Sequence, residues 1–188
     1  MARSVLNRRA TYEDVRRAPD SVVAEILDGD LYTSPRPAPR HANASSVLGT
    51  QINGPFHLGQ RGPGGWWILD EPELHLGEDV VVPDLAGWRR DRMPALPDEA
   101  AFTLRPDWAC EVLSPSTEDL DRGRKLAFYA REGVPYLWLI DPLKRTLEVL
   151  ALVDGRWTSA ATHVGAVAVR ANPFEAVDID LQPLWPSP

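Results

Sequence analysis

The chain has 188 residues, of which 44% are hydrophobic and 25% are charged, and its formal net charge is −7. This length predicts one domain over residues 1–188, and the acidic balance argues against non-specific coating of DNA or attraction to an anionic membrane. The sequence shows neither a signal peptide nor the roughly 18 apolar residues of a membrane span, and its single cysteine excludes an intramolecular disulfide. We therefore expect a cytoplasmic protein without membrane contact.

Cap and turn signals predict a helix and a hairpin near the N-terminus. Residues 1–20 are interpreted as an N-terminal helical segment, in which Thr11 is the N-cap and Asp14 completes a capping box. A strand pair over residues 22–32 turns at an Asp-Gly pair. The prolines of residues 35–39 then predict a rigid connector.

The middle of the chain alternates helical and strand-like patterns. Residues 41–58 have the apolar spacing of an amphipathic helix, and a glycine-rich turn follows. Two strands are predicted over residues 66–76 and 80–88, with Pro83 marking an edge or a bulge in the second. Residues 89–105, rich in charges and prolines, predict a long loop.

The second half predicts a strand, helix, strand crossover. Residues 107–113 form its first strand, a Ser116–Asp119 capping box begins its helix, and residues 136–140 form its second strand. A hairpin over residues 147–161 and a C-terminal tail, residues 174–188, complete the chain. This order predicts an α/β (α+β mixed) fold with a central mixed sheet flanked by helices.

Two carboxylates stand in apolar runs. Glu111 lies in the middle of the strand over residues 107–113, and Asp84 follows a run of valines ending at Pro83. A buried carboxylate is costly unless a cation or a set of donors satisfies it. If the two strands are neighbours, Asp84 and Glu111 converge and could hold Mg²⁺, which would lower the pKa of a bound water and neutralise charge on phosphorus.

The helix after Glu111 adds a stripe of functional side chains. Asp121, Lys125 and Tyr129 follow one another at four-residue spacing and therefore share a face. Lys125 could orient or deprotonate a water molecule or stabilise the transition state. An exposed acid–lysine pair is the ordinary alternative for Asp121 and Lys125, as a buried salt bridge is for Glu111.

A family resemblance rests on an ordered set of motifs: Glu25-Ile-Leu-Asp-Gly-Asp30, a helix starting at His41, Pro83-Asp84, Glu111-Val-Leu-Ser-Pro-Ser-Thr117, Asp121, Lys125, Tyr129, Gly133-Val134, Tyr136-Leu-Trp138 and Ile140-Asp141. Together they resemble the Uma-type "putative restriction endonucleases" of the PD-(D/E)XK nuclease superfamily. The resemblance implies a restriction-endonuclease-like core of a mixed sheet flanked by helices.

The resemblance also implies roles for individual residues. Asp84 and Glu111 become the metal-binding acids, with Mg²⁺ or Mn²⁺ as the cofactor. The superfamily's usual third residue lies two positions after the acid, where this chain has Leu113, and the matching lysine is Lys125 on the following helix. Glu25 is a further ligand or a water-holding acid, or else a strand-end charge, and His41 is a cap or a phosphate contact.

The leading hypothesis is therefore a Mg²⁺-dependent endonuclease that hydrolyses DNA, working as a homodimer. Two alternatives remain open: a catalytically silent nuclease fold that serves as a binding or assembly module, and a metal-dependent phosphoesterase with another substrate. Trp88, Arg89 and Arg90, expected near the site, are candidates for stacking on a base and holding phosphate. Arginines after residue 88 and around Lys125 could supply a local basic patch.

Overall fold

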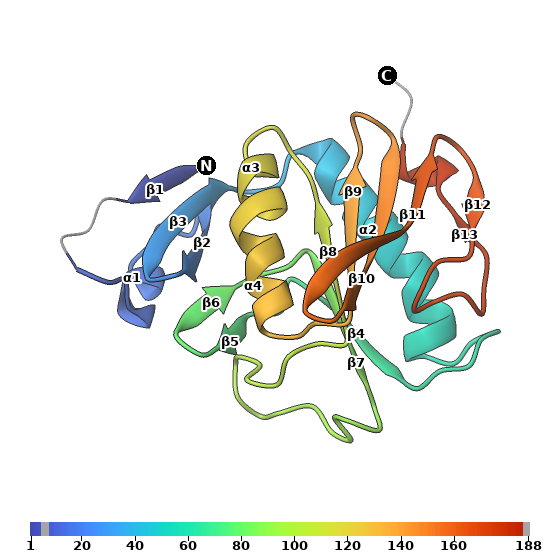
Figure 1. Ribbon diagram of the computed structural model, residues 1–188, viewed down its shortest axis with the longest axis horizontal. Coiled ribbons are helices and arrows are strands. Elements are labelled where there is room, and N and C mark those ends of the chain that lie inside the picture. Colours follow the sequence, from blue (N-terminus) through green and yellow to red (C-terminus); the bar gives the residue numbers. More distant parts are fainter. Residues whose placement is uncertain (5–7, 186–188) are drawn as a thin grey trace.

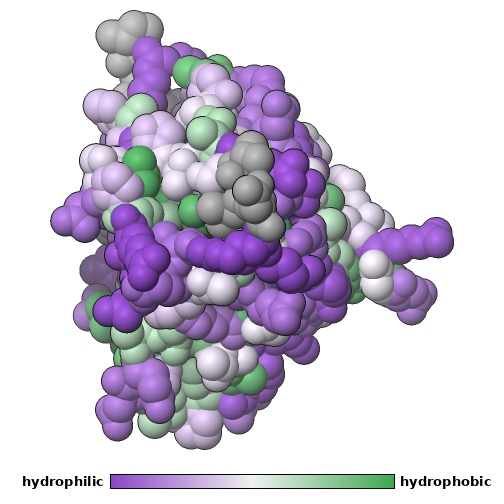
Figure 2. Space-filling model, turned by 90° about the vertical axis from the view of Figure 1, so that its left-hand side faces the viewer, coloured by the Kyte–Doolittle hydropathy of each residue, from purple (hydrophilic) through white to green (hydrophobic). Residues whose placement is uncertain are grey.

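The computed structural model describes residues 1–4 and 8–185, which form a five-stranded sheet, a six-stranded sheet and a small C-terminal pair of strands. Figure 1 shows the two large sheets on either side of a helical rod made of α3 and α4. The face that carries the N-terminal elements is mainly hydrophilic, with apolar side chains interspersed (Figure 2). Within the described residues, no helix is both long enough and apolar enough to cross a membrane.

The five-stranded sheet has the order β1 (Ala2–Ser4), β3 (Asp30–Pro35), β2 (Val22–Leu27), β6 (Asp79–Val81) and β5 (Leu74–Leu76). The predicted hairpin is confirmed as β2 and β3, and the capping box of Thr11 and Asp14 begins helix α1 (Tyr12–Arg16). Within the predicted helical segment of residues 1–20, this short helix is present, whereas Ala2–Ser4 is a strand that pairs with β3. Residues 5–7 of that segment lie outside the described residues.

The six-stranded sheet has the order β11 (Arg156–Val164), β10 (Thr146–Val153), β9 (Tyr136–Asp141), β8 (Trp108–Val112), β7 (Leu85–Arg89) and β4 (Trp66–Asp70). Strands β8 and β9 are parallel and are joined through the helical rod, so the predicted crossover is confirmed. Strand β7 pairs with β8 in antiparallel fashion, which makes the strand after Asp84 a neighbour of the strand of Glu111.

The prediction of one strand over residues 66–76 and one over residues 80–88 is wrong, because each stretch forms two strands. Each stretch is divided between the two sheets, as β4 and β5 and as β6 and β7. Proline lacks the N–H that a ladder requires, and Pro72 and Pro83 both lie in the gaps. Pro83 therefore marks a crossing between sheets and leaves Asp84 outside regular strand structure.

The helices begin where local chemistry allows. Helix α2 (Pro39–Ile52) starts two residues before the predicted helix, because a proline fits the first helical position, and it continues into a π-helical turn, η1 (Asn53–His57). The rod consists of α3 (Glu118–Leu120), a π-helical turn η2 (Asp121–Lys125) and α4 (Leu126–Arg131). The predicted Ser116 cap is wrong, because the Ser116 hydroxyl bonds to Ser114 and Thr117 occupies the cap position.

Strand β8 divides the core between its two faces. Trp108, Cys110 and Val112 pack on the side of α2, whereas Ala109 and Leu113 pack on the side of α4, as the strand alternation predicts. The C-terminal residues are part of the first side: β12 (Ala168–Val169), β13 (Ile179–Asp180) and a 3₁₀ turn, η3 (Gln182–Leu184), surround the fully buried Phe174. The predicted tail thus contributes buried side chains to the core: Phe174, Ile179, Leu181, Leu184 and Trp185. Residues 186–188 of that tail lie outside the described residues.

Candidate metal-dependent active site

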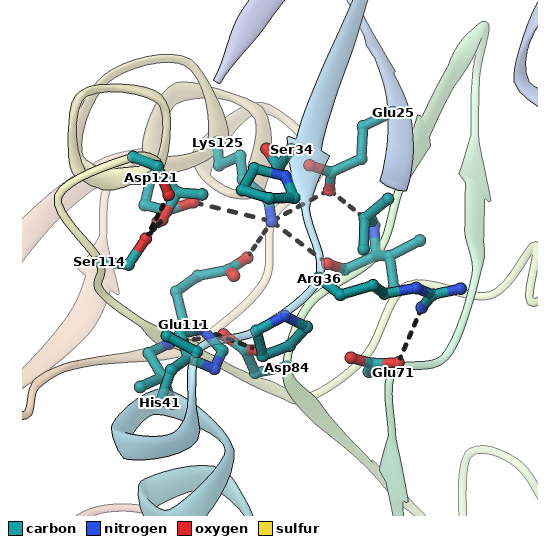
Figure 3. A pocket seen from close by; sticks show the side chains of 18 of the residues that line it. Glu25, Ser34, Arg36, His41, Glu71, Asp84, Glu111, Ser114, Asp121 and Lys125 are labelled. Atoms are coloured by element: carbon teal, nitrogen blue, oxygen red, sulfur yellow. Dashed lines mark hydrogen bonds and ion pairs between the residues drawn. The ribbon is translucent and has the colours of Figure 1, made fainter. Parts of the chain in front are cut away.

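A cavity of about 250 Å³ opens at the junction of the two large sheets and the helical rod (Figure 3). The five-stranded sheet contributes Glu25, the start of α2 contributes His41, and the crossing after β6 contributes Asp84. Strand β8 and the rod complete the wall. Residues that are up to 100 positions apart in the sequence therefore meet at one point: Glu25, His41, Asp84, Glu111, Asp121 and Lys125.

Glu111 is the most deeply placed carboxylate of the cavity, with 2% of its surface exposed. Its Oε1 accepts a hydrogen bond of 2.5 Å from the Tyr129 hydroxyl and lies 2.9 Å from Lys125 Nζ. Burial raises the pKa of Glu111 well above its usual range, and the charge of Lys125 opposes this rise. Lys125 and Tyr129, two of the three predicted helix residues, therefore contact Glu111 on the strand.

Lys125 is buried among oxygens that come from four parts of the chain. Its Nζ lies 3.0 Å from Glu25 Oε1 and 3.8 Å from Asp121 Oδ1, and it donates to the Val82 carbonyl at 3.2 Å. Burial disfavours the charged ammonium, but the carboxylates of Glu111, Glu25 and Asp121 outweigh it and raise the pKa of Lys125 well above its usual value. The lysine is thus a permanent cation at neutral pH.

Asp84 is fixed beside Glu111 by the pairing of β7 with β8. Its Oδ2 accepts the backbone N–H of Val112 at 2.6 Å, and its Oδ1 lies 3.3 Å from His41 Nε2. Burial opposes protonation of His41, but the hydrogen bond and charge of Asp84 prevail and raise the pKa of the imidazole. His41 therefore contacts a carboxylate and is not a helix cap.

The charges in the cavity do not balance. Glu25, Asp84, Glu111 and Asp121 can carry four negative charges, whereas Lys125 supplies one positive charge and His41 a second only when it is protonated. Burial raises the pKa of Asp121 to about 6, despite the opposing charge of Lys125. Within residues 1–4 and 8–185, no three acidic, histidine or cysteine side chains already converge as a metal-binding group. The hard oxygens and the excess negative charge nevertheless fit a divalent cation.

A family model described as "Uma2: Putative restriction endonuclease" matches residues 9–182. The chain belongs to the Uma2 family. The resemblance in the sequence is thereby confirmed at the level of the family. No curated protein matches the chain.

A solved structure shows the same architecture as this Uma2 chain. It is described as a putative nuclease belonging to DUF820 from Anabaena variabilis ATCC 29413, and it aligns with a TM-score of 0.74. The alignment covers 94% of this chain and 97% of that chain at 21% sequence identity. At this identity the likeness establishes the fold, and it confirms the mixed α/β class.

The three predicted substrate-binding residues lie away from the cavity of this Uma2 chain. Trp88 is fully buried, stacks on Phe102 and donates its Nε1–H to a backbone carbonyl, so its ring has no free face for a base. Arg89 and Arg90 lie at the far end of β7 from Asp84 and contact the Trp66 and Trp67 rings. The expectation that they border the acidic site is therefore wrong.

The predicted basic patch does not form around Lys125, because acidic partners bind its arginines. Arg122 binds Glu118 and Glu148, and Arg124 lies 3.3 Å from Asp28. Lys125 is buried in the cavity. The sequence could not show these pairings, since most of the partners are distant along the chain.

Some cavity residues escaped the sequence analysis. The Val82 carbonyl binds Lys125, and the exposed Arg36 lies 3.8 Å from Glu71 in the same wall. The signal for Val82 was its position directly before the Pro83-Asp84 motif. Arg36 stood in the proline-rich connector, whose function nothing in the sequence indicated.

Proposed function

We propose that the protein is a Mg²⁺-dependent endonuclease that hydrolyses DNA phosphodiester bonds at this cavity. The observation that carries the proposal is the unbalanced negative charge beside a buried, protonated lysine. Membership of a family described as "Putative restriction endonuclease" supports the choice of substrate class.

Asp84 and Glu111 are the residues that would hold the cation. Both carboxylates line the cavity. The Val112 N–H fixes Oδ2 of Asp84, whose Oδ1 faces His41, and the Tyr129 hydroxyl fixes Oε1 of Glu111. A bound Mg²⁺ would supply a Lewis acid that activates water and neutralises negative charge on the phosphoryl group. Mn²⁺ fits the same oxygens.

Lys125 acts as a fixed cation in this proposal. Its raised pKa makes it a poor base at neutral pH, so it stabilises the developing negative charge and does not remove a proton from water. Glu25 holds the ammonium on the side opposite Glu111, because its Oε1 also accepts the Val82 N–H at 2.9 Å and is thereby fixed. Glu25 thus serves as a partner of Lys125.

The test combines cleavage with metal binding. Supercoiled, linear and single-stranded DNA are incubated with the protein and Mg²⁺ or Mn²⁺, and Mn²⁺ binding is measured by calorimetry. Asp84→Ala, Glu111→Ala and Lys125→Ala should each abolish cleavage, and the first two should also weaken Mn²⁺ binding. Glu132→Ala, which removes a surface carboxylate outside the cavity, is the control.

Three outcomes separate the alternatives. Intact DNA together with no Mn²⁺ binding contradicts the proposal and favours a silent binding module. Mn²⁺ binding with hydrolysis of mono- or dinucleotides alone favours a different phosphoesterase. Cleavage of both strands of a duplex would point to a homodimer, since each chain offers one such cavity, and light scattering should then give twice the mass of the chain.

A further inference from the structure

The two oxygens of Glu111 have different surroundings. Lys125 Nζ and the Tyr129 hydroxyl both lie at Oε1, at 2.9 and 2.5 Å. Among residues 1–4 and 8–185, no hydrogen bond reaches Oε2, and Glu111 lines the cavity. Two donors on one oxygen fix the plane of the carboxylate and leave the other oxygen for a ligand.

The ring of Tyr129 packs in the core, whereas its hydroxyl contacts the cavity residue Glu111. Its ring is fully buried on α4 and packs edge-on against Phe128, a role that a phenylalanine would fill equally well. Its hydroxyl has Glu111 as its hydrogen-bond partner. A carboxylate oxygen accepts, so the phenol is the donor in this hydrogen bond.

We propose that Tyr129 is a positioning residue. It holds Glu111 so that Oε1 stays bound to Tyr129 and Lys125 and Oε2 faces the cation. This inference rests on the proposed function, because it assigns Glu111 as a metal ligand. A freely rotating carboxylate would instead present either oxygen to the cation or collapse onto Lys125. The hydrogen bond from Tyr129 thus sets the direction from which the metal is bound.

The experiment compares Tyr129→Phe with Tyr32→Phe in the full chain. Both changes remove one hydroxyl from a buried ring, but Tyr32 lies on β3 and its hydroxyl faces Asp30, outside the cavity. Tyr129→Phe should weaken Mn²⁺ binding at least about tenfold and lower kcat for DNA with little change in KM, the size of effect seen when a partner of a metal ligand is lost. Tyr32→Phe should leave both unchanged.

A spectroscopic measurement distinguishes positioning from packing. The four tyrosines, labelled with ¹³C at Cζ, give separate signals that Phe variants of Tyr12, Tyr32 and Tyr136 assign by elimination, even if Tyr129→Phe does not fold. Mg²⁺ should shift the Tyr129 signal, because a cation on Oε2 changes the oxygen that accepts its hydrogen bond. The other three signals should stay in place.

The outcomes of the two proposals are separable. Normal Mn²⁺ binding and turnover in a folded Tyr129→Phe variant, or an unmoved Tyr129 signal under Mg²⁺ saturation, overturns the positioning role alone. Metal binding that depends on Tyr129 in a protein that cuts no DNA overturns the nuclease proposal alone. Wild-type protein that binds neither cation overturns both.

Discussion

Single residues were the most predictable part of this protein. Glu111 and Asp84 stood out because ionised groups are rare in apolar strands, and the structure brings both into one cavity. The prediction for Trp88 was wrong because a tryptophan beside arginines in the sequence can belong either to a base-stacking surface or to the core. Composition gives a residue's chemistry, but only burial decides whether that chemistry is available.

Replacement of Lys125 should lower the stability of the protein, because it removes the cation that the buried carboxylates share. Lys125→Met leaves three buried carboxylates without their shared cation, and we expect the free energy of unfolding to fall by about 3–5 kcal/mol in chelator. Urea unfolding with and without Mn²⁺ measures this change, and Mn²⁺ should restore part of it. Lys144→Met, which removes an exposed lysine with two acidic partners, should change little. Equal stability of the two variants would refute the argument.

Asp121 should make stability depend on pH. Its folded pKa of about 6 lies above its ordinary value of 3.8, so the folded state binds the proton more tightly than the unfolded state between these two values. Ionisation of Asp121 therefore costs stability as the pH rises through this window, by up to about 2–3 kcal/mol. The free energy of unfolding of Asp121→Asn, measured relative to wild type by urea titration, should rise from pH 4 to pH 7. A difference that is flat with pH would contradict this prediction.

Elements were predictable where chain-local signals determine them. The Thr11 capping box, the Asp-Gly hairpin turn and the crossover from β8 to β9 depend on neighbouring residues and are confirmed. The division of two predicted strands between two sheets was not visible, because a proline reads equally well as a bulge, an edge or a break. The π-helical turns left no signal in the spacing of apolar residues.

An ion pair with a buried carboxylate links the end of α4 to the five-stranded sheet. Arg131 binds Asp79, which is 5% exposed and also accepts the backbone N–H of Asp28 at 2.8 Å. Arg131→Met leaves Asp79 buried without its cation, but the arginine is half-exposed and screened by solvent, so we expect a loss of about 1–2 kcal/mol. Thermal or urea unfolding gives the value. An unchanged midpoint would show that the sheet holds α4 without this pair.

At the scale of the whole molecule, the site exists only because two sheets meet. Glu25 lies on one sheet and Glu111 on the other, so their proximity depends on sheet packing, for which single-sequence patterns carry no information. The family motifs identified both residues, but geometry alone shows that Lys125 bridges them. The mixed sheet was predictable from the order of elements, and the two-sheet architecture was not.

The distribution of charge predicts weak dependence of DNA binding on salt. The acidic chain presents two exposed arginines as candidate phosphate contacts: Arg36 lines the cavity, and Arg40 precedes His41 in the first turn of α2. Two such contacts imply that the affinity falls by about tenfold between 50 and 200 mM salt. Fluorescence anisotropy with Ca²⁺ in place of Mg²⁺ measures this slope, and Arg36→Ala should make it shallower. A fall of a thousandfold or more would require a basic surface that the structure lacks among its described residues.

The π-helical turn at Asp121–Lys125 has a consequence for how this site can vary between related chains. Such a turn is equivalent to one residue inserted into an α-helix. Gly123 lies within it, and a side chain there would meet no neighbour. Loss of one residue there would leave Asp121 and Lys125 three positions apart in a regular α-helix, which changes how the two side chains lie relative to each other while the rest of the rod stays helical. A chain of this family could thus lose this placement of Asp121 against Lys125 through one small deletion and still fold.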